Sequence, residues 1–202
     1  AITDHSKSSR IANGLDSTRL FSQIEQIRDL NTSMDELEIL VGSEVDILKD
    51  GQLDFSDQIL SQLDVVVASV HSNIDMNETD MTKRLIQAIE NPFVDILGHP
   101  TGRLLMRRPE YALNLEAIIE AAIANKVALE INASPSRLDL SPEIVKHARE
   151  KGAMISINTD AHSVENLDRM WLGINVAKRS WLNKENVINT FTLNEFQKWK
   201  QR

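Results

Sequence analysis

The strongest constraint on the fold of this chain is a set of short apolar runs that each end in a histidine or a carboxylate. In one run Ile155 and Ile157 alternate with polar residues, and Asp160 and His162 follow at the same spacing of two. Alternate residues of a strand share a face, so the polar residues would line one side and the isoleucines would pack on the other. Four further runs end at His5, Glu44, His71 and His99. Five such runs predict a parallel sheet or barrel whose strand ends meet at a metal site.

Helical patterns lie between these runs, so strands and helices alternate along the chain. Ser141 and Pro142 are typical of a helix start, and Gly152 suits the left-handed residue that ends a helix. We expect strands at residues 1–4, 38–47, 64–71, 93–98, 127–132 and 153–160. We expect helices at residues 16–30, 77–90, 114–125 and 142–151, and a last helix that begins at the capping pair Thr192 and Glu195. Strict alternation predicts an α/β fold with parallel strands.

The composition limits the domain organisation and the chemistry of any metal site. With 202 residues, of which 42% are hydrophobic, the chain can form one sizeable core, and we expect a single domain over residues 1–202. The chain has no cysteine, which excludes disulfides and thiolate zinc sites and leaves imidazole and carboxylate as the strong ligands. The net charge of −8 argues against tight, non-specific binding of nucleic acid by this domain alone.

The hydrophobic residues are not arranged for a membrane. No apolar stretch approaches the roughly 18 residues that a membrane span requires, and no signal peptide opens the sequence. We therefore expect a soluble protein of the cytoplasm.

A structural role is the alternative for each candidate ligand. A lone histidine on a strand is more often a structural residue than a ligand, and the same holds for a solitary carboxylate. Four of the five histidines end strand-like runs, whereas His147 lies in the helix expected at 142–151 and is assigned a structural or solvated role. The recurrence of the pattern favours ligands over coincidence.

Several motifs of the chain resemble those of a known superfamily. The later motifs of the polymerase and histidinol phosphatase (PHP) superfamily are similar to residues 1–6, 42–48, 67–72, 98–105 and 158–163. More narrowly, the C-terminal PHP domain of bacterial and archaeal family X DNA polymerases resembles residues 91–103, 129–140 and 186–190. The resemblance spans nearly the whole chain.

The resemblance implies a distorted seven-stranded β/α barrel, similar to a TIM barrel, with a trinuclear metal centre at the carboxyl ends of its strands. Glu44 would bridge two metals, and Glu44, His71 and Asp160 are the predicted catalytic residues. Manganese, zinc or iron suits carboxylate and imidazole ligands. Carried over by motif, the metal ligands are His5, Glu44, His71, His99, Asp160 and His162.

The first motif of the superfamily, a His-x-His pair on strand one, is expected to precede residue 1. We therefore expect the first barrel strand and up to three ligands to lie outside this chain. With those ligands outside, we expect the chain to bind fewer than three metal ions.

Metal-dependent hydrolysis of phosphoesters is the reaction that the resemblance implies. In family X polymerases this is a 3′–5′ exonuclease that acts on DNA 3′ ends in repair, with a polymerase domain upstream in the same chain. Arg103, Arg137 and Asn132 lie at or a few residues after expected strand ends and are candidates for binding substrate phosphate. A surface position is the alternative for each arginine. For Asn132 the alternatives are a donor that supports a metal ligand and a polar group of the barrel interior. The other functions considered are a small-molecule phosphatase of the histidinol phosphatase type and an inactive PHP domain that braces a polymerase.

Overall fold

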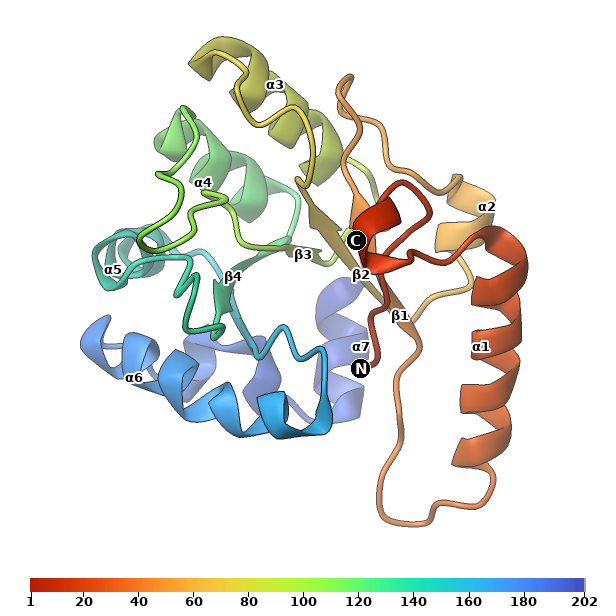
Figure 1. Cartoon of the computed structure of the whole chain (residues 1–202). Coiled ribbons are helices and arrows are strands. Elements are labelled where there is room, and N and C mark those ends of the chain that lie inside the picture. The colour runs from red at the N-terminus through yellow and green to blue at the C-terminus, as the bar shows by residue number, and fades with distance from the viewer. Residues whose placement is uncertain (202) are drawn as a thin grey trace.

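Five parallel strands form the centre of the structure, a computed structural model in which residues 1–201 are described. The strands lie side by side in the order in which they occur along the chain (Figure 1). They are β1 (Gly42–Asp46), β2 (Val65–Ser69), β3 (Ile96–Leu97), β4 (Ala128–Asn132) and β5 (Ile155–Asn158). Each strand falls within an expected range and helices separate them, which confirms an α/β fold with a parallel sheet.

Most of the helices cover the outside of this sheet (Figure 1), whereas the last helix packs against its inner face through Phe196 and Trp199. They are α1 (Ser17–Asn31), α2 (Asp57–Leu60), α3 (Glu78–Ile89), α4 (Leu115–Ala124), α5 (Pro142–Lys151), α6 (Met170–Arg179) and α7 (Leu193–Lys200). Short 3-10 helices lie at η1 (Arg10–Ala12), η2 (Val164–Arg169), η3 (Lys184–Asn186) and η4 (Ile188–Thr190). The expected caps are present, because the Ser141 side chain accepts a hydrogen bond from the backbone of Ile144 and Gly152 adopts φ 95°. None of the helices among residues 1–201 is both long and apolar enough to cross a membrane.

The strand expected at residues 1–4 is not a regular strand. Residues 1–6 instead lie parallel to β1 and form isolated bridges, Ile2 with Val41 and His5 with Glu44. Backbone hydrogen bonds of 2.9 to 3.1 Å, such as Gly42 N–H to Ile2 O, hold this segment in place. It therefore occupies a sixth position beside β1. The sheet has five strands among the described residues, so the seven-stranded barrel stays a prediction.

The two faces of the sheet carry different side chains because neighbouring residues of a strand point in opposite directions. Val66 and Ala68 of β2 belong to the larger core cluster, under the helices. Val65 and Val67 belong to a second, inner cluster, together with Ile96, Ala128 and Ile188. The inner face is apolar at the start of the strands and becomes polar toward their carboxyl ends, where Glu44, Glu130, Asn132, Ser156 and Asn158 lie.

Candidate metal centre

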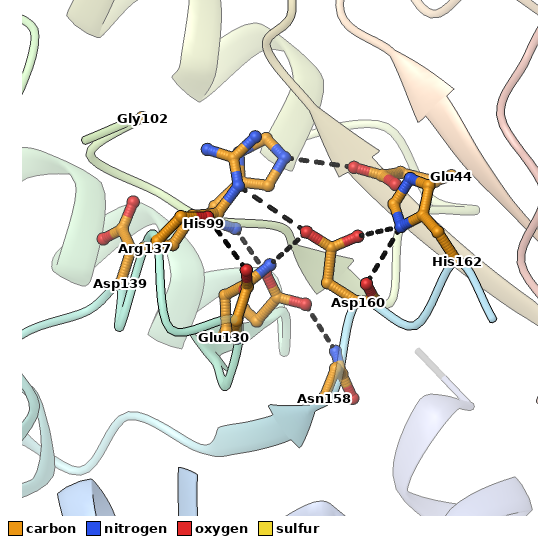
Figure 2. A network of polar contacts seen from close by, with 12 residues as sticks. Glu44, His99, Gly102, Glu130, Arg137, Asp139, Asn158, Asp160 and His162 are labelled. Atoms are coloured by element: carbon orange, nitrogen blue, oxygen red, sulfur yellow. Dashed lines mark hydrogen bonds and ion pairs between the residues drawn. The ribbon is translucent and has the colours of Figure 1, made fainter. Parts of the chain in front are cut away.

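The carboxylate of Glu44 lies at the centre of a group of imidazole rings. Its Oε1 lies 3.2 Å from His71 Nε2 and 3.1 Å from His99 Nε2, and its Oε2 lies 3.4 Å from His5 Nδ1. Figure 2 shows His99 directed at Glu44. Ligand atoms of His5, Glu44 and His71 all lie within 4.8 Å of one another, a spacing that could hold a metal ion.

The parallel strands bring these residues together. Glu44 lies on β1, His71 two residues after the end of β2 and His99 two residues after the end of β3. The register aligns Glu44 with Val67 and Val67 with Ile96, so the residues that follow β2 and β3 lie at one edge of the sheet. His5 reaches the same edge because its segment bridges directly to Glu44.

The donor set fits a divalent transition metal. The rings of His5 and His71 have centroids 5.0 Å apart, and those of His71 and His99 are 5.1 Å apart. The Nδ1 atom of His5 is buried and forms no hydrogen bond within residues 1–201, although it lies 3.4 Å from Glu44 Oε2. Buried polar atoms normally have a partner, so this nitrogen is a candidate metal ligand. Imidazole nitrogens around a carboxylate suit manganese, zinc or iron.

Asp46 orients His71 and is a site residue that the sequence reasoning missed. Its Oδ1 lies 2.5 Å from His71 Nδ1, which leaves Nε2 of the ring directed at Glu44. Ser8 Oγ donates to the other oxygen of Asp46 at 2.7 Å. Carboxylates that hold the far nitrogen of a ligating histidine set its orientation. A signal existed in the sequence, since Asp46 follows Glu44 by two and therefore shares its strand face.

The two charges at this centre stabilise each other. Burial lowers the pKa of His71, but hydrogen bonds with Asp46 and Glu44 outweigh it and raise the pKa to about 9. Burial raises the pKa of Glu44, but hydrogen bonds with His71 and His99 hold it well below its usual range. A metal ion must therefore displace a proton from His71, and metal affinity should rise with pH.

Asp160 and His162 reach the site by a turn and not along a strand. β5 ends at Asn158, and Asp160 has φ 51°, which ends the extended conformation. The expectation that the strand continues to Asp160 is therefore wrong. Asp160 Oδ1 lies 3.6 Å from His162 Nδ1, and the His162 ring lies 5.7 Å from that of His5. His162 is the most exposed of these histidines, with 62% of its side chain accessible.

Glu130 is a second residue that the sequence reasoning did not assign to the site. It lies on the inner face of β4 and is 4% exposed. Burial raises its pKa to about 7, although hydrogen bonds from Asn158 and from the backbone of His99 act in the opposite direction. The alternation of Leu129, Glu130 and Ile131 in an expected strand was the available signal.

The two candidate arginines have different surroundings. Arg103 Nε donates to Arg137 O at 3.0 Å, a second nitrogen donates to Leu138 O, and the third lies 3.5 Å from Glu110. Arg137 Nε lies 3.6 Å from Asp160 Oδ2, and its buried Nη1 has no hydrogen-bond partner within residues 1–201. Arg137 thus lies beside Asp160 (Figure 2) with an unused donor, whereas Arg103 holds the backbone of residues 137 and 138. Their phosphate contacts stay predictions.

A third missed residue, Arg84, braces the loops after β1 and β2. Its guanidinium, on α3, is 1% exposed. Nε donates to Leu48 O at 2.8 Å, Nη1 donates to Ser72 O at 3.0 Å and to Asn73 O at 3.3 Å, and Nη2 donates to Ile47 O. These loops follow Asp46 and His71 directly, so Arg84 fixes the backbone that carries both.

A cavity of about 970 Å³ opens onto the centre. Its polar end is lined by His5, Glu44, Glu130, Asn132, Asp160 and His162. Its other end is apolar and includes Val65, Val67, Ile96 and Phe196. His147 lies away from it on the surface of α5, where its Nε2 is 2.8 Å from Glu116. The structure thus places His147 outside the metal centre, with 47% of its side chain accessible.

Comparison with known proteins identified several relatives of this chain. The chain is 44% identical over 202 residues, its whole length, to a "DNA polymerase/3'-5' exonuclease PolX" of Bacillus subtilis (strain 168). It is 34% identical over 188 residues, 87% of its length, to a "Probable phosphatase" of Thermoanaerobacter sp. (strain X514), and covers 74% of that protein. It is 35% identical over 164 residues to a "Probable phosphatase" of Caldanaerobacter subterraneus, covering 76% of this chain and 62% of the relative.

The relatives differ in how much of their length the chain matches. The chain spans 35% of the length of the B. subtilis relative, against 74% of the Thermoanaerobacter one. No protein-family model matches the chain.

Proposed function

Since this chain belongs to the PHP superfamily, we propose that it hydrolyses phosphoesters with the aid of divalent metal ions. The observation that carries the proposal is the position of Glu44, whose carboxylate lies within 3.4 Å of imidazole nitrogens from His5, His71 and His99. Such a group of carboxylate and imidazole ligands from separate segments suits metal binding, because these are the side chains that manganese, zinc and iron prefer.

The proposed ligands would hold up to three ions. Glu44 would take part in two of the sites, and His71 and His99 would complete one of them. Asp160 would help to hold the second ion, and His5 with His162 would hold the third. We propose manganese, zinc or iron, with up to three ions when all superfamily ligands are present. Bound divalent ions lower the pKa of a coordinated water to about 7 and stabilise the charge that develops on a reacting phosphate.

The chain's own residues would bind and orient the substrate. Arg137, with its free Nη1 beside Asp160, would donate hydrogen bonds to a phosphate oxygen, since guanidinium groups match phosphate geometry. Asn132 would act mainly by holding Asp160, to which its Nδ2 donates at 3.0 Å. Arg103 would hold the 137–138 backbone and thereby position Arg137.

A DNA 3′ end is the substrate that we propose. Support comes from the B. subtilis relative, whose name includes a 3′–5′ exonuclease and which is more similar to this chain than the other relatives reported above. On the same basis we propose a polymerase domain in cis and a role in DNA repair. A single PHP domain over residues 1–202, a seven-stranded barrel and a cytoplasmic location are proposed with it.

The second candidate is a small-molecule phosphatase. The probable phosphatase of Thermoanaerobacter favours it, because the chain covers 74% of that protein without a polymerase-sized remainder. An inactive bracing domain is less well supported, since all six predicted ligand residues are present and four of them surround one point.

Substrate choice is tested with the natural full-length protein and Mn²⁺. We expect stepwise release of nucleotides from the 3′ end of a 5′-labelled DNA strand, and no release after chelation. Histidinol phosphate should be a poor substrate in a parallel phosphate-release assay. If the protein cleaves histidinol phosphate and leaves the DNA strand uncut, the result would favour the phosphatase. If it cleaves neither substrate, the result would favour the bracing role.

Substitution of Arg137 tests the proposed phosphate contact. We expect Arg137→Ala to lower kcat/KM on DNA by about ten- to a hundredfold, because one charge-assisted hydrogen bond contributes about 1.5–3 kcal/mol. The metal content should not change, since Arg137 is not a ligand. The exposed Arg107→Ala is the matched control and should behave as wild type. A wild-type rate for Arg137→Ala would remove this arginine from the site.

A further inference from the structure

Three hydrogen-bond donors from three elements converge on the buried carboxylate of Glu130. The backbone N–H of His99 donates to Oε2 at 2.6 Å, and Asn132 Nδ2 donates to the same oxygen at 3.2 Å. Asn158 Nδ2 donates to Oε1 at 2.7 Å. Figure 2 shows Glu130 between His99, Asn158 and Asp160. No lysine or arginine of residues 1–201 forms an ion pair with Glu130, so the charge of His99 and these hydrogen bonds stabilise the carboxylate.

The bond to His99 supports an unfavourable backbone conformation. His99 has φ 27°, in a region that side chains with a Cβ rarely adopt and that costs on the order of 1–3 kcal/mol. In this conformation its N–H points at Glu130 while its Nε2 lies 3.1 Å from Glu44. The carboxylate of Glu130 therefore favours the backbone geometry that directs the His99 ring into the metal centre.

The bond from Asn132 extends the same support to Asp160. Asn132 Nδ2 has two hydrogens and donates to Glu130 and, at 3.0 Å, to Asp160 Oδ2. Asn132 Oδ1 accepts from Ser134 N at 3.0 Å, which fixes the amide with its NH₂ toward both carboxylates. Asp160 also has a left-handed backbone, with φ 51°. Two predicted ligands with strained backbones are thus tied to one carboxylate.

We propose that Glu130 is a positioning residue that sets the orientation of His99 and Asp160 in the metal centre. The inference rests on the metal-dependent function proposed above. The role needs a carboxylate, because all three neighbours are donors. A glutamine offers one acceptor oxygen and an NH₂ that would face a donor, so one hydrogen bond would be replaced by a repulsive contact.

The test compares Co²⁺ binding by the natural protein and by Glu130→Gln, because the visible spectrum of Co²⁺ reports its ligands. We expect Glu130→Gln to weaken Co²⁺ binding by about ten- to a hundredfold, the usual effect of changing a residue that orients a ligand, and to shift the absorption bands. Glu25 is exposed, so Glu25→Gln is the matched control and should leave the Co²⁺ affinity and the absorption bands unchanged.

A second variant covers the case in which Glu130→Gln does not fold. Asn132→Ala removes the donor shared by Glu130 and Asp160 but leaves the bond to His99, and it should also alter the Co²⁺ spectrum. Glu130→Gln could instead fold with lower thermal stability but bind Co²⁺ with the wild-type affinity and spectrum. That result would overturn the positioning role and leave the proposed function in place. Failure of the wild-type protein to bind Co²⁺ would overturn the proposed function and this inference together.

Discussion

Glu44→Gln is expected to abolish metal binding and phosphoester hydrolysis together. The carboxylate is the shared neighbour of three imidazoles, and glutamine keeps its volume but removes its charge. Loss of one partner from a buried ion pair costs about 3–5 kcal/mol, so metal affinity should fall by at least about a hundredfold. Elemental analysis of the purified protein and release of nucleotides from a DNA 3′ end measure the two losses.

The outcome for Glu44→Gln has clear controls. Glu25→Gln on the exposed face of α1 should retain metal and activity. If a separate polymerase domain is present, its DNA synthesis should survive Glu44→Gln, which would confine the loss to the domain that carries Glu44. Wild-type metal content and rate in Glu44→Gln would show that Glu44 is not at the centre of the reaction.

Arg84→Met is expected to lower the free energy of unfolding by about 3–5 kcal/mol, because it leaves one buried and three partly buried carbonyl contacts without their donor, and each lost partner costs up to about 1–3 kcal/mol. The affected carbonyls belong to Ile47, Leu48, Ser72 and Asn73, in the loops that follow β1 and β2. Equilibrium unfolding in urea, with metal removed, measures the change.

A neighbouring lysine on the same helix provides the comparison for Arg84. Lys83 is exposed, and Lys83→Met should change stability by less than about 0.5 kcal/mol. Since the two loops adjoin Asp46 and His71, Arg84→Met should also weaken metal binding. Equal stabilities for Arg84→Met and Lys83→Met would contradict the bracing role of Arg84.

Local patterns in the sequence were sufficient to predict the alternation of strands and helices. The alternation of apolar and polar residues around Ile155 and Ile157 reflects the two faces of a strand, and it depends only on neighbouring positions. In the same way Ser141, Pro142 and Gly152 mark the ends of α5 through local backbone preferences. The expected strand at 1–4 was less accurate, because regular pairing depends on a partner that is distant in sequence.

The residues around the metal centre were only partly predictable. Glu44, His71 and His99 could be found because each lies in or just after an apolar run, and parallel strands bring such ends to one edge of the sheet. Asp160 was found by the same reasoning, although the strand ends before it and a left-handed turn carries it to the site.

By itself the sequence determined which residues lie on strand faces and which could bind metal, since both follow from spacing and side-chain chemistry. Only the tertiary structure decided which partner each polar group has. Asp46 meets His71, Glu130 meets the backbone of His99, and Arg137 but not Arg103 faces Asp160 with a free donor. These contacts join residues 23 or more positions apart, and they depend on strand register and loop conformation, which local periodicity does not encode.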